Sequence, residues 1–159
     1  MTNKEIKIAY VEYASLEELQ PQDRALAEAA IEAVSLAYAP YSNFNVGAAV
    51  RFEDGEIIKG ANQENAAYPS GLCAERTALF YANSQYPDMA IKTLAIAACN
   101  ENGTPSANII SPCGACRQVM LETENRFGKP IRILLYGPKE VYVVESVASL
   151  LPLAFSDLS

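Results

Sequence analysis

The sequence predicts an α/β fold in three layers, with helices on both faces of a mixed central sheet of roughly five strands. Two observations carry this prediction. Short apolar segments typical of strands alternate along the chain with longer segments whose apolar residues recur at helical spacing. In addition, Asp54-Gly55 stands between two apolar segments, which is a strong signal for a hairpin.

Length and composition indicate one globular domain over residues 1–159. The chain has 159 residues, of which 50% are hydrophobic and 19% charged, so it can bury a sizeable core. Residues 1–20 form an extension before the first helix. Within it, residues 5–13 alternate, with Ile6, Ile8 and Tyr10 on one face, which predicts a strand at the edge of the sheet.

The first half of the predicted fold is a helix followed by a hairpin. Apolar residues recur at helical spacing from Pro21, a favourable first helical residue, and Pro40 ends this helix. Residues 45–53 and 56–62 then read as the two hairpin strands, and a helix follows over about 73–84.

The second half alternates strands with helices. Residues 92–100 are continuously apolar, as in a strand buried on both faces. A polar loop leads to a helix over 111–127, which Gly128 and Pro130 close. Residues 131–137 and 141–146 predict strands, and 146–152 a short final helix.

Charge and hydropathy exclude several kinds of partner. Twelve Lys and Arg against 19 Asp and Glu give a net charge of −7, which repels a nucleic-acid backbone. No apolar segment approaches the roughly 20 residues that span a bilayer, so we expect no membrane contact. The first ten residues lack the apolar stretch of a signal peptide. We therefore expect a cytoplasmic protein that binds a small molecule.

The cysteines predict a metal site. Cys113 and Cys116 form a C-x-x-C at the start of a predicted helix, and Cys73 holds the same kind of position 40 residues earlier. The sequence has no histidine, so any metal must be held by thiolates and carboxylates. Helix N-termini favour thiolates. Three of them around Zn²⁺ would leave one tetrahedral position open, as in catalytic sites.

Two charged residues complete the predicted site. Glu75 follows Cys73 by two positions, and a carboxylate beside the metal can take a proton from water and return it elsewhere. Arg76 is placed to offset the negative charge that three thiolates leave around Zn²⁺.

Two other readings of the cysteines are open. The C-x-x-C could be a thioredoxin-like redox pair, although Cys73 and Glu75 would then have no role. Alternatively, Cys99 could supply a fourth sulfur and close a structural zinc site. A cysteine at the end of an apolar strand is more often a small core residue.

Several spaced motifs resemble those of one enzyme family. "CAERTALF" and "SPCGACRQVM" follow the zinc deaminase pattern with cysteine in place of histidine. Together with "YAPYSNFNVGAAV", "NQENAAYPSGLCAERTA" and "LLPLAF", they resemble the small cytidine deaminases that act on free nucleosides, over residues 24–155. The resemblance implies one Zn²⁺ per subunit and hydrolysis of cytidine and 2′-deoxycytidine to uridine and 2′-deoxyuridine in pyrimidine salvage. It also implies a homotetramer whose sites are shared between subunits.

The resemblance also implies roles for individual residues. Cys73, Cys113 and Cys116 match the zinc ligands, Glu75 the proton shuttle, and Arg76 a donor to the ligand thiolates. The positions that match substrate contacts are Asn62 and Glu64 for the ribose hydroxyls, Phe44 for packing against the nucleoside, Ala74 for a backbone contact with the base, and Tyr68 and Phe155 for contacts in a neighbouring subunit's site.

The sequence leaves two competing functions open. The substrate could be another aminated heterocycle or nucleoside, although the amide and carboxylate of "NQEN" suit ribose hydroxyls better than a free base. From a different class, the chain could be a zinc-stabilised binding module without activity. The presence of Glu75 beside Cys73 favours an enzyme.

Overall fold

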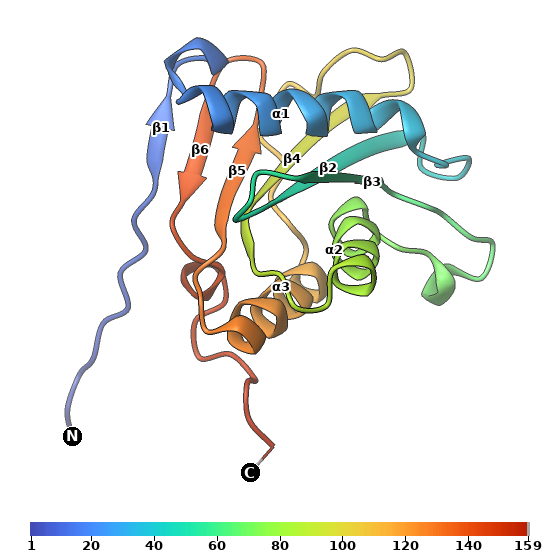
Figure 1. Cartoon of the computed structure of the whole chain (residues 1–159). Coiled ribbons are helices and arrows are strands. Elements are labelled where there is room, and N and C mark those ends of the chain that lie inside the picture. Colours follow the sequence, from blue (N-terminus) through green and yellow to red (C-terminus); the bar gives the residue numbers. More distant parts are fainter. Residues whose placement is uncertain (159) are drawn as a thin grey trace.

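The computed structural model describes residues 1–158, which form a mixed sheet with helices on both faces (Figure 1). The sheet has six strands in the order β1-β6-β5-β4-β2-β3. The predicted three-layer α/β fold is confirmed, with six strands instead of roughly five because β1 adds to one edge. The strands are β1 (Val11–Tyr13), β2 (Phe44–Phe52), β3 (Ile57–Ala61), β4 (Ile91–Asn100), β5 (Arg132–Tyr136) and β6 (Val141–Val144).

Pairing within the sheet is antiparallel except between β4 and β5. The hairpin β2–β3 turns at Gly55, whose φ of 94° suits glycine. The parallel pair is joined by a crossover that contains helix α3 (Gly114–Phe127). A continuously apolar β4 therefore lies at the centre of the sheet, between β5 and β2, as its sequence predicts.

Strand β1 is shorter than the alternating segment 5–13 that predicts it. It pairs with β6 from Val11↔Val143 to Tyr13↔Val141. Because β6 ends at Val144, residues before Tyr10 have no strand beside them. They continue from β1 as an extended segment that leaves the body of the molecule (Figure 1).

Helix α1 (Pro21–Ala33) covers one face of the sheet and ends earlier than Pro40. A short 3-10 helix, η2 (Val34–Leu36), follows it. The chain then turns extended because the Tyr38 backbone pairs with the segment after β3. Its N–H donates to the Asn62 carbonyl at 2.9 Å, and its carbonyl accepts from the Glu64 N–H at 2.8 Å.

A buried ion pair joins α1 to the sheet. Asp23, in the first turn of α1, accepts from Arg51 Nη2 on β2 at 3.1 Å and from Arg132 Nη1 on β5 at 2.9 Å. The side chains of Asp23 and Arg51 are both 5% exposed. Removing one partner would leave an uncompensated charge in the core.

The other face is covered by α2 (Ala74–Gln85) and α3, with the final 3-10 helix η4 (Val147–Leu150) beside α3. The buried Glu124 carboxylate of α3 accepts from Val147 N–H at 2.9 Å, Ser146 Oγ at 2.8 Å and Ile131 N–H at 2.8 Å. These bonds fasten η4 and the start of β5 to the helix.

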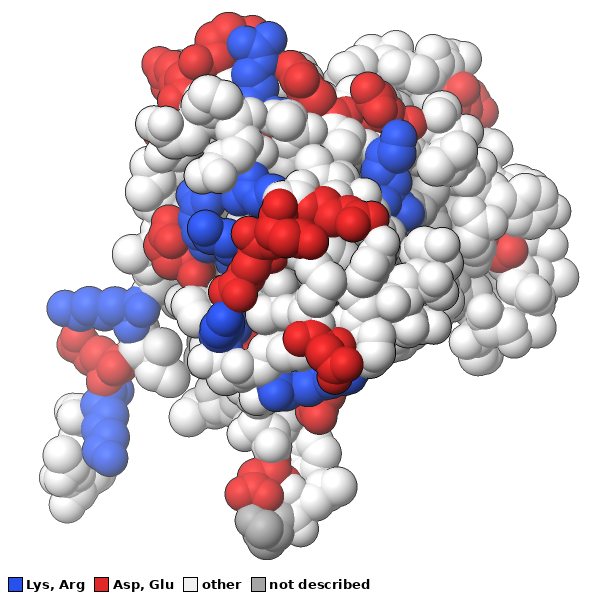
Figure 2. All heavy atoms as spheres, in the orientation of Figure 1, with Lys and Arg blue, Asp and Glu red and all other residues white. Residues whose placement is uncertain are grey.

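Within residues 1–158, no helix has the length and apolar character needed to cross a membrane. Acidic and basic side chains are interspersed over the face drawn in Figure 2, with uncharged surface between them.

Candidate active site

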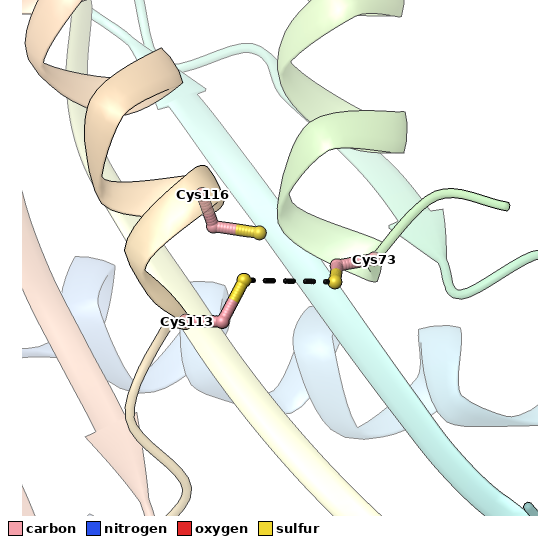
Figure 3. Close-up of side chains that lie close together, drawn as sticks. All are labelled: Cys73, Cys113 and Cys116. Atoms are coloured by element: carbon pink, nitrogen blue, oxygen red, sulfur yellow. Dashed lines mark hydrogen bonds between the residues drawn. The ribbon is translucent and has the colours of Figure 1, made fainter. Parts of the chain in front are cut away.

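The three metal-ligand candidates lie where two helices begin. Cys73 is the N-cap residue of α2, and Cys113 is the N-cap residue of α3. Cys116 follows in the first turn of α3. Figure 3 shows the three side chains pointing toward one another across the gap between the helices. The positive ends of both helix dipoles therefore face the sulfur atoms.

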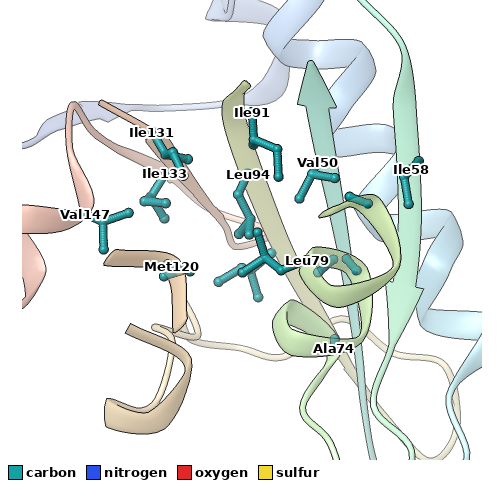
Figure 4. Packing of buried hydrophobic residues seen from close by; sticks show 14 of the residues in the cluster. Val50, Ile58, Ala74, Leu79, Ile91, Leu94, Met120, Ile131, Ile133 and Val147 are labelled. Carbon is teal, nitrogen blue, oxygen red and sulfur yellow. The ribbon is translucent and has the colours of Figure 1, made fainter. Parts of the chain in front are cut away.

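Packing against the sheet fixes the two helix starts. On α2, Ala74, Ala78 and Leu79 are fully buried, and on α3 Met120 is fully buried (Figure 4). A Cβ on Gly60 of β3 would lie 2.5 Å from the Ala78 backbone nitrogen, so glycine there lets α2 approach the sheet. Dense packing leaves the backbone behind the cysteines little freedom.

The sulfur geometry fits one tetrahedral zinc ion. The Sγ atoms of Cys73, Cys113 and Cys116 all lie within 4.8 Å of one another, and those of Cys73 and Cys113 are 3.9 Å apart. With Zn–S bonds of about 2.3 Å, tetrahedral ligands stand about 3.8 Å apart. Cys116 is buried while Cys113 is exposed, so the group is open on one side.

Arg76 favours the thiolate form of Cys73. The neighbouring Cys116 thiol and Arg76, whose Nη2 donates to Cys73 Sγ at 3.6 Å, lower the pKa of Cys73 to about 5. The neighbouring Cys73 sulfur, together with burial, raises the pKa of Cys116. Within the described chain, Arg76 Nε is buried and has no hydrogen-bond partner. It is therefore a further donor beside the candidate ligands.

Glu75 lies in the first turn of α2 and is only 4% exposed. Burial raises the pKa of its carboxyl, and the negative charge of Cys73 raises it further. A raised pKa makes a carboxylate a stronger base and suits it to take up and return a proton.

Cys99 lies apart from the three-cysteine group. It belongs to the apolar cluster on the α1 face of the sheet, whereas α2 and α3 cover the opposite face. Burial raises the pKa of its thiol. The closed four-sulfur site is therefore wrong, and Cys99 is a small core residue, as its position in an apolar strand suggests.

A cavity of about 440 Å³ opens beside Cys73. Four residues with predicted roles line it: Asn62, Glu64, Tyr68 and Arg76 join Cys73 there. The other lining residues are Tyr41, Ser42, Gln63, Asn65, Gly71 and Leu72. The structure thus brings Cys73 of the metal-ligand group and the candidate ribose contacts to one open pocket.

The start of β2 holds the Asn62 side chain, and the loop before β2 holds the Glu64 side chain. The Asn62 amide donates to the Phe44 carbonyl and accepts from the Val46 N–H, each at 2.9 Å. The Glu64 carboxylate accepts from the Tyr41 N–H at 2.9 Å and from both the N–H and the hydroxyl of Ser42. The Ser42 hydroxyl is the main cause of the lowered pKa of Glu64, which keeps this carboxylate charged.

The other four residues with predicted substrate contacts do not lie together in the single chain. Ala74 is fully buried in the first turn of α2, and Phe44 is half-buried at the start of β2. Tyr68 is 75% exposed at the open side of the cavity. Phe155 is 66% exposed, and its carbonyl accepts from Gln118 Nε2 of α3 at 2.8 Å. Within one described chain, none of Ala74, Phe44 and Phe155 lines the cavity.

Residues 20–127 match the family model for the zinc-binding region of cytidine and deoxycytidylate deaminases. The chain belongs to this deaminase family. Among curated relatives, the cytidine deaminase of Halalkalibacterium halodurans is 50% identical over 97 residues, which cover 61% of this chain and 68% of that protein. The cytidine deaminase of Sporosarcina psychrophila is 46% identical over 125 residues, covering 77% of this chain and 85% of that protein.

Solved structures agree with this assignment. The crystal structure of cytidine deaminase from Burkholderia pseudomallei superposes with a TM-score of 0.69 at 43% identity, and the match covers 82% of this chain and 97% of that one. A cytidine deaminase structure from Mycobacterium tuberculosis gives a TM-score of 0.65 at 33% identity, with 84% and 96% coverage. The deaminases are hydrolases, the matched family region is a zinc-binding one, and the group of Cys73, Cys113 and Cys116 could hold a single zinc ion.

Among the pocket residues that sequence reasoning missed, Tyr41 and Ser42 contact Glu64. Their contact with Glu64 spans 22 or 23 positions of the chain, so no local pattern reveals it. One local signal exists: Asn43 has a φ of 54°, a left-handed conformation that asparagine tolerates. The Ser42 hydroxyl also accepts from the Phe44 N–H at 3.1 Å, which makes "PYSNF" a tight turn.

Proposed function

We propose that this chain catalyses the zinc-dependent hydrolytic deamination of cytidine and of 2′-deoxycytidine, releasing uridine or 2′-deoxyuridine and ammonia. The observation that carries the proposal is a buried carboxyl, Glu75, two positions from Cys73, which lines an open cavity and clusters with Cys113 and Cys116. Family membership supports the same reaction. We further propose that the protein works in the cytoplasm in pyrimidine salvage, as one catalytic domain over residues 1–159.

The metal would be held by Cys73, Cys113 and Cys116. Bound there, zinc supplies positive charge that makes water a stronger acid and nucleophile. Three thiolates weaken this effect because they surround the metal with negative charge. Arg76 counters it by donating to Cys73 Sγ at 3.6 Å, and both helix N-termini act in the same direction.

Glu75 would move the protons. It removes a proton from the attacking water and delivers it to the ring nitrogen next to the carbon that carries the amino group. As the C–O bond forms, that carbon becomes tetrahedral. Glu75 then takes the second proton of the water and passes it to the amino group, which leaves as ammonia when the C–N bond breaks. The buried position and raised pKa of Glu75 suit both proton transfers.

The cavity would hold the nucleoside by its sugar. Glu64 offers a charged acceptor for ribose hydroxyls, and Asn62 stands next to it with one amide N–H beyond its bond to Phe44. Phe44 would pack against the nucleoside, and the backbone at Ala74 would contact the base. Hydroxyl recognition favours a nucleoside over a free base.

A homotetramer would complete the site. Tyr68 and Phe155 are largely exposed aromatic side chains in the single chain, as expected for groups that pack against another subunit. We propose that both contribute to a neighbouring subunit's pocket, so that assembly is a condition of full activity.

The test follows the ultraviolet change as cytidine becomes uridine, with zinc content measured on the same protein. Wild type should convert cytidine and 2′-deoxycytidine, whereas Glu75→Gln should bind zinc in equal amount and show no turnover. Zinc-loaded wild type without activity on either nucleoside would overturn the proposal. Activity retained by Glu75→Gln would remove Glu75 from the proton-transfer role.

A further inference from the structure

The N-terminal arm, residues 4–10, is the part of the chain that the deaminase reaction leaves without a role. It precedes the family match, which begins at residue 20, and it projects from the body of the molecule with charged side chains of both signs (Figure 2). In the described chain its interactions are the Tyr10–Tyr142 ring contact at 4.7 Å and an exposed Lys7–Glu5 pair at 3.8 Å.

The arm carries a row of apolar side chains on one face. Ile6, Ile8 and Tyr10 are 58%, 50% and 53% exposed. In an extended chain, alternate residues share a face, so Lys4 and Glu12 stand at the two ends of this row. Tyr10 defines the face, because its partner Tyr142 packs against the core under α2 and α3.

The backbone of the arm is also unpaired. Strand β1 is the last strand of the sheet and pairs only with β6. Beyond Val11, the described residues of the arm have no strand on either side. An extended edge with free N–H and C=O groups is a template for strand addition.

The order of residues in the arm is self-complementary in one antiparallel register. If Ile8 meets Ile8 of a second copy on a two-fold axis, Ile6 stands opposite Tyr10 and Lys4 opposite Glu12. All the apolar residues of the row then face apolar residues, and the charges at its ends face opposite charges.

Neighbouring registers lose this match. Centring the pairing on Lys7 places Tyr10 opposite Lys4, and centring it on Ala9 places Ile6 opposite Glu12. On the face of the row, each shift therefore sets an apolar side chain against a charge, which the Ile8-centred register does not. On the opposite face, the Ile8-centred register places Glu5 opposite Val11 and Lys7 opposite Ala9, so it is the row from Lys4 to Glu12 that selects this register.

We propose that the N-terminal arm pairs with the arm of a second copy of this chain, antiparallel and with Ile8 on the two-fold axis. The pairing continues the sheet from one subunit into the next through β1 and gives the free edge a partner. A two-fold contact is self-complementary by symmetry, and the alternation of Lys4, Ile6, Ile8, Tyr10 and Glu12 meets that condition.

The main test is disulfide cross-linking of the full-length, zinc-loaded protein. In the proposed register, the Cα atoms of a cysteine pair at position 8 lie about 5 Å apart, which suits a disulfide. Two cysteines at position 6 would lie about 14 Å apart, at 3.4 Å per residue. Under mild oxidation, Ile8→Cys should therefore give at least about tenfold more covalent dimer than Ile6→Cys, with wild type as background. Equal yields from the two variants would overturn the proposal.

A charge exchange tests the register independently. In the Ile8→Cys background, Lys4→Glu alone and Glu12→Lys alone should each reduce cross-linking, because each places like charges opposite one another. The double variant Lys4→Glu/Glu12→Lys restores the opposite charges and should restore the yield. If it does not, the proposed pairing is wrong. The arm lies outside the catalytic pocket, so cytidine turnover should stay unchanged in all these variants. Measuring turnover beside cross-linking therefore distinguishes failure of the pairing from failure of the deaminase function.

Discussion

Replacing Arg76 with Gln should weaken zinc binding without unfolding the protein. Arg76 Nη2 donates to Cys73 Sγ at 3.6 Å, at the open side of the ligand group. A hydrogen bond from a charged donor contributes about 1.5–3 kcal/mol. Because the guanidinium is partly exposed to solvent, the lower end of that range applies. A loss of about 1.4 kcal/mol corresponds to a tenfold higher Kd for zinc.

The assay is competition between the protein and a chelator of known zinc affinity. Arg76→Lys keeps the charge without the planar donor pair and should fall between wild type and Arg76→Gln. Arg126→Gln is the matched control, because that guanidinium donates to the Pro87 carbonyl at 2.6 Å, away from the thiols. An Arg76→Gln protein with the zinc affinity of wild type would refute the charge-compensating role.

Three further predictions concern the pocket, the core and the metal. Ser42→Ala removes the hydroxyl that holds Glu64 and should raise KM for cytidine several-fold with little change in kcat; an unchanged KM would contradict this role. Asp23→Asn leaves the buried Arg51 without its charge partner and should lower the free energy of unfolding by about 3–5 kcal/mol in urea titrations. Glu28→Gln, which breaks an exposed ion pair, should leave the midpoint nearly unchanged, and equal effects would refute the burial reasoning. Zinc removal by a chelator should lower the melting temperature by roughly 10 °C, and a constant melting temperature would mean that the site adds no stability.

The sequence predicted best what local chemistry decides. Gly128 ends α3 with a φ of 62°, as a glycine after a helix predicts, and Gly55 turns the hairpin. The closeness of Cys113 and Cys116 is equally predictable, because C-x-x-C spacing at a helix start places the two sulfur atoms by local geometry. Cys73 needed one more step, since its approach to Cys113 depends on α2 and α3 packing on the same face.

Contacts between residues far apart in the chain could not be predicted from the sequence. Helix α1 ends at Ala33 because Tyr38 pairs with residues after β3, a contact that no helical pattern contains. Strand β1 is short because β6 is short. Phe155 is 66% exposed in the single chain, so neither the sequence pattern nor the packing of the one described chain gives its aromatic ring a partner.

Helix α3 links the catalytic end of the molecule to its C-terminal segment. Arg117 donates to the carbonyl of Pro112, just before Cys113, at 2.9 Å and to that of Leu150 at 2.7 Å. Further along the helix, Glu124 fastens Val147. The helix thus has a candidate zinc ligand at one end and the C-terminal segment bonded along its length. Because Arg117 holds both Pro112 and Leu150, a change in the position of the C-terminal segment would alter a contact next to Cys113.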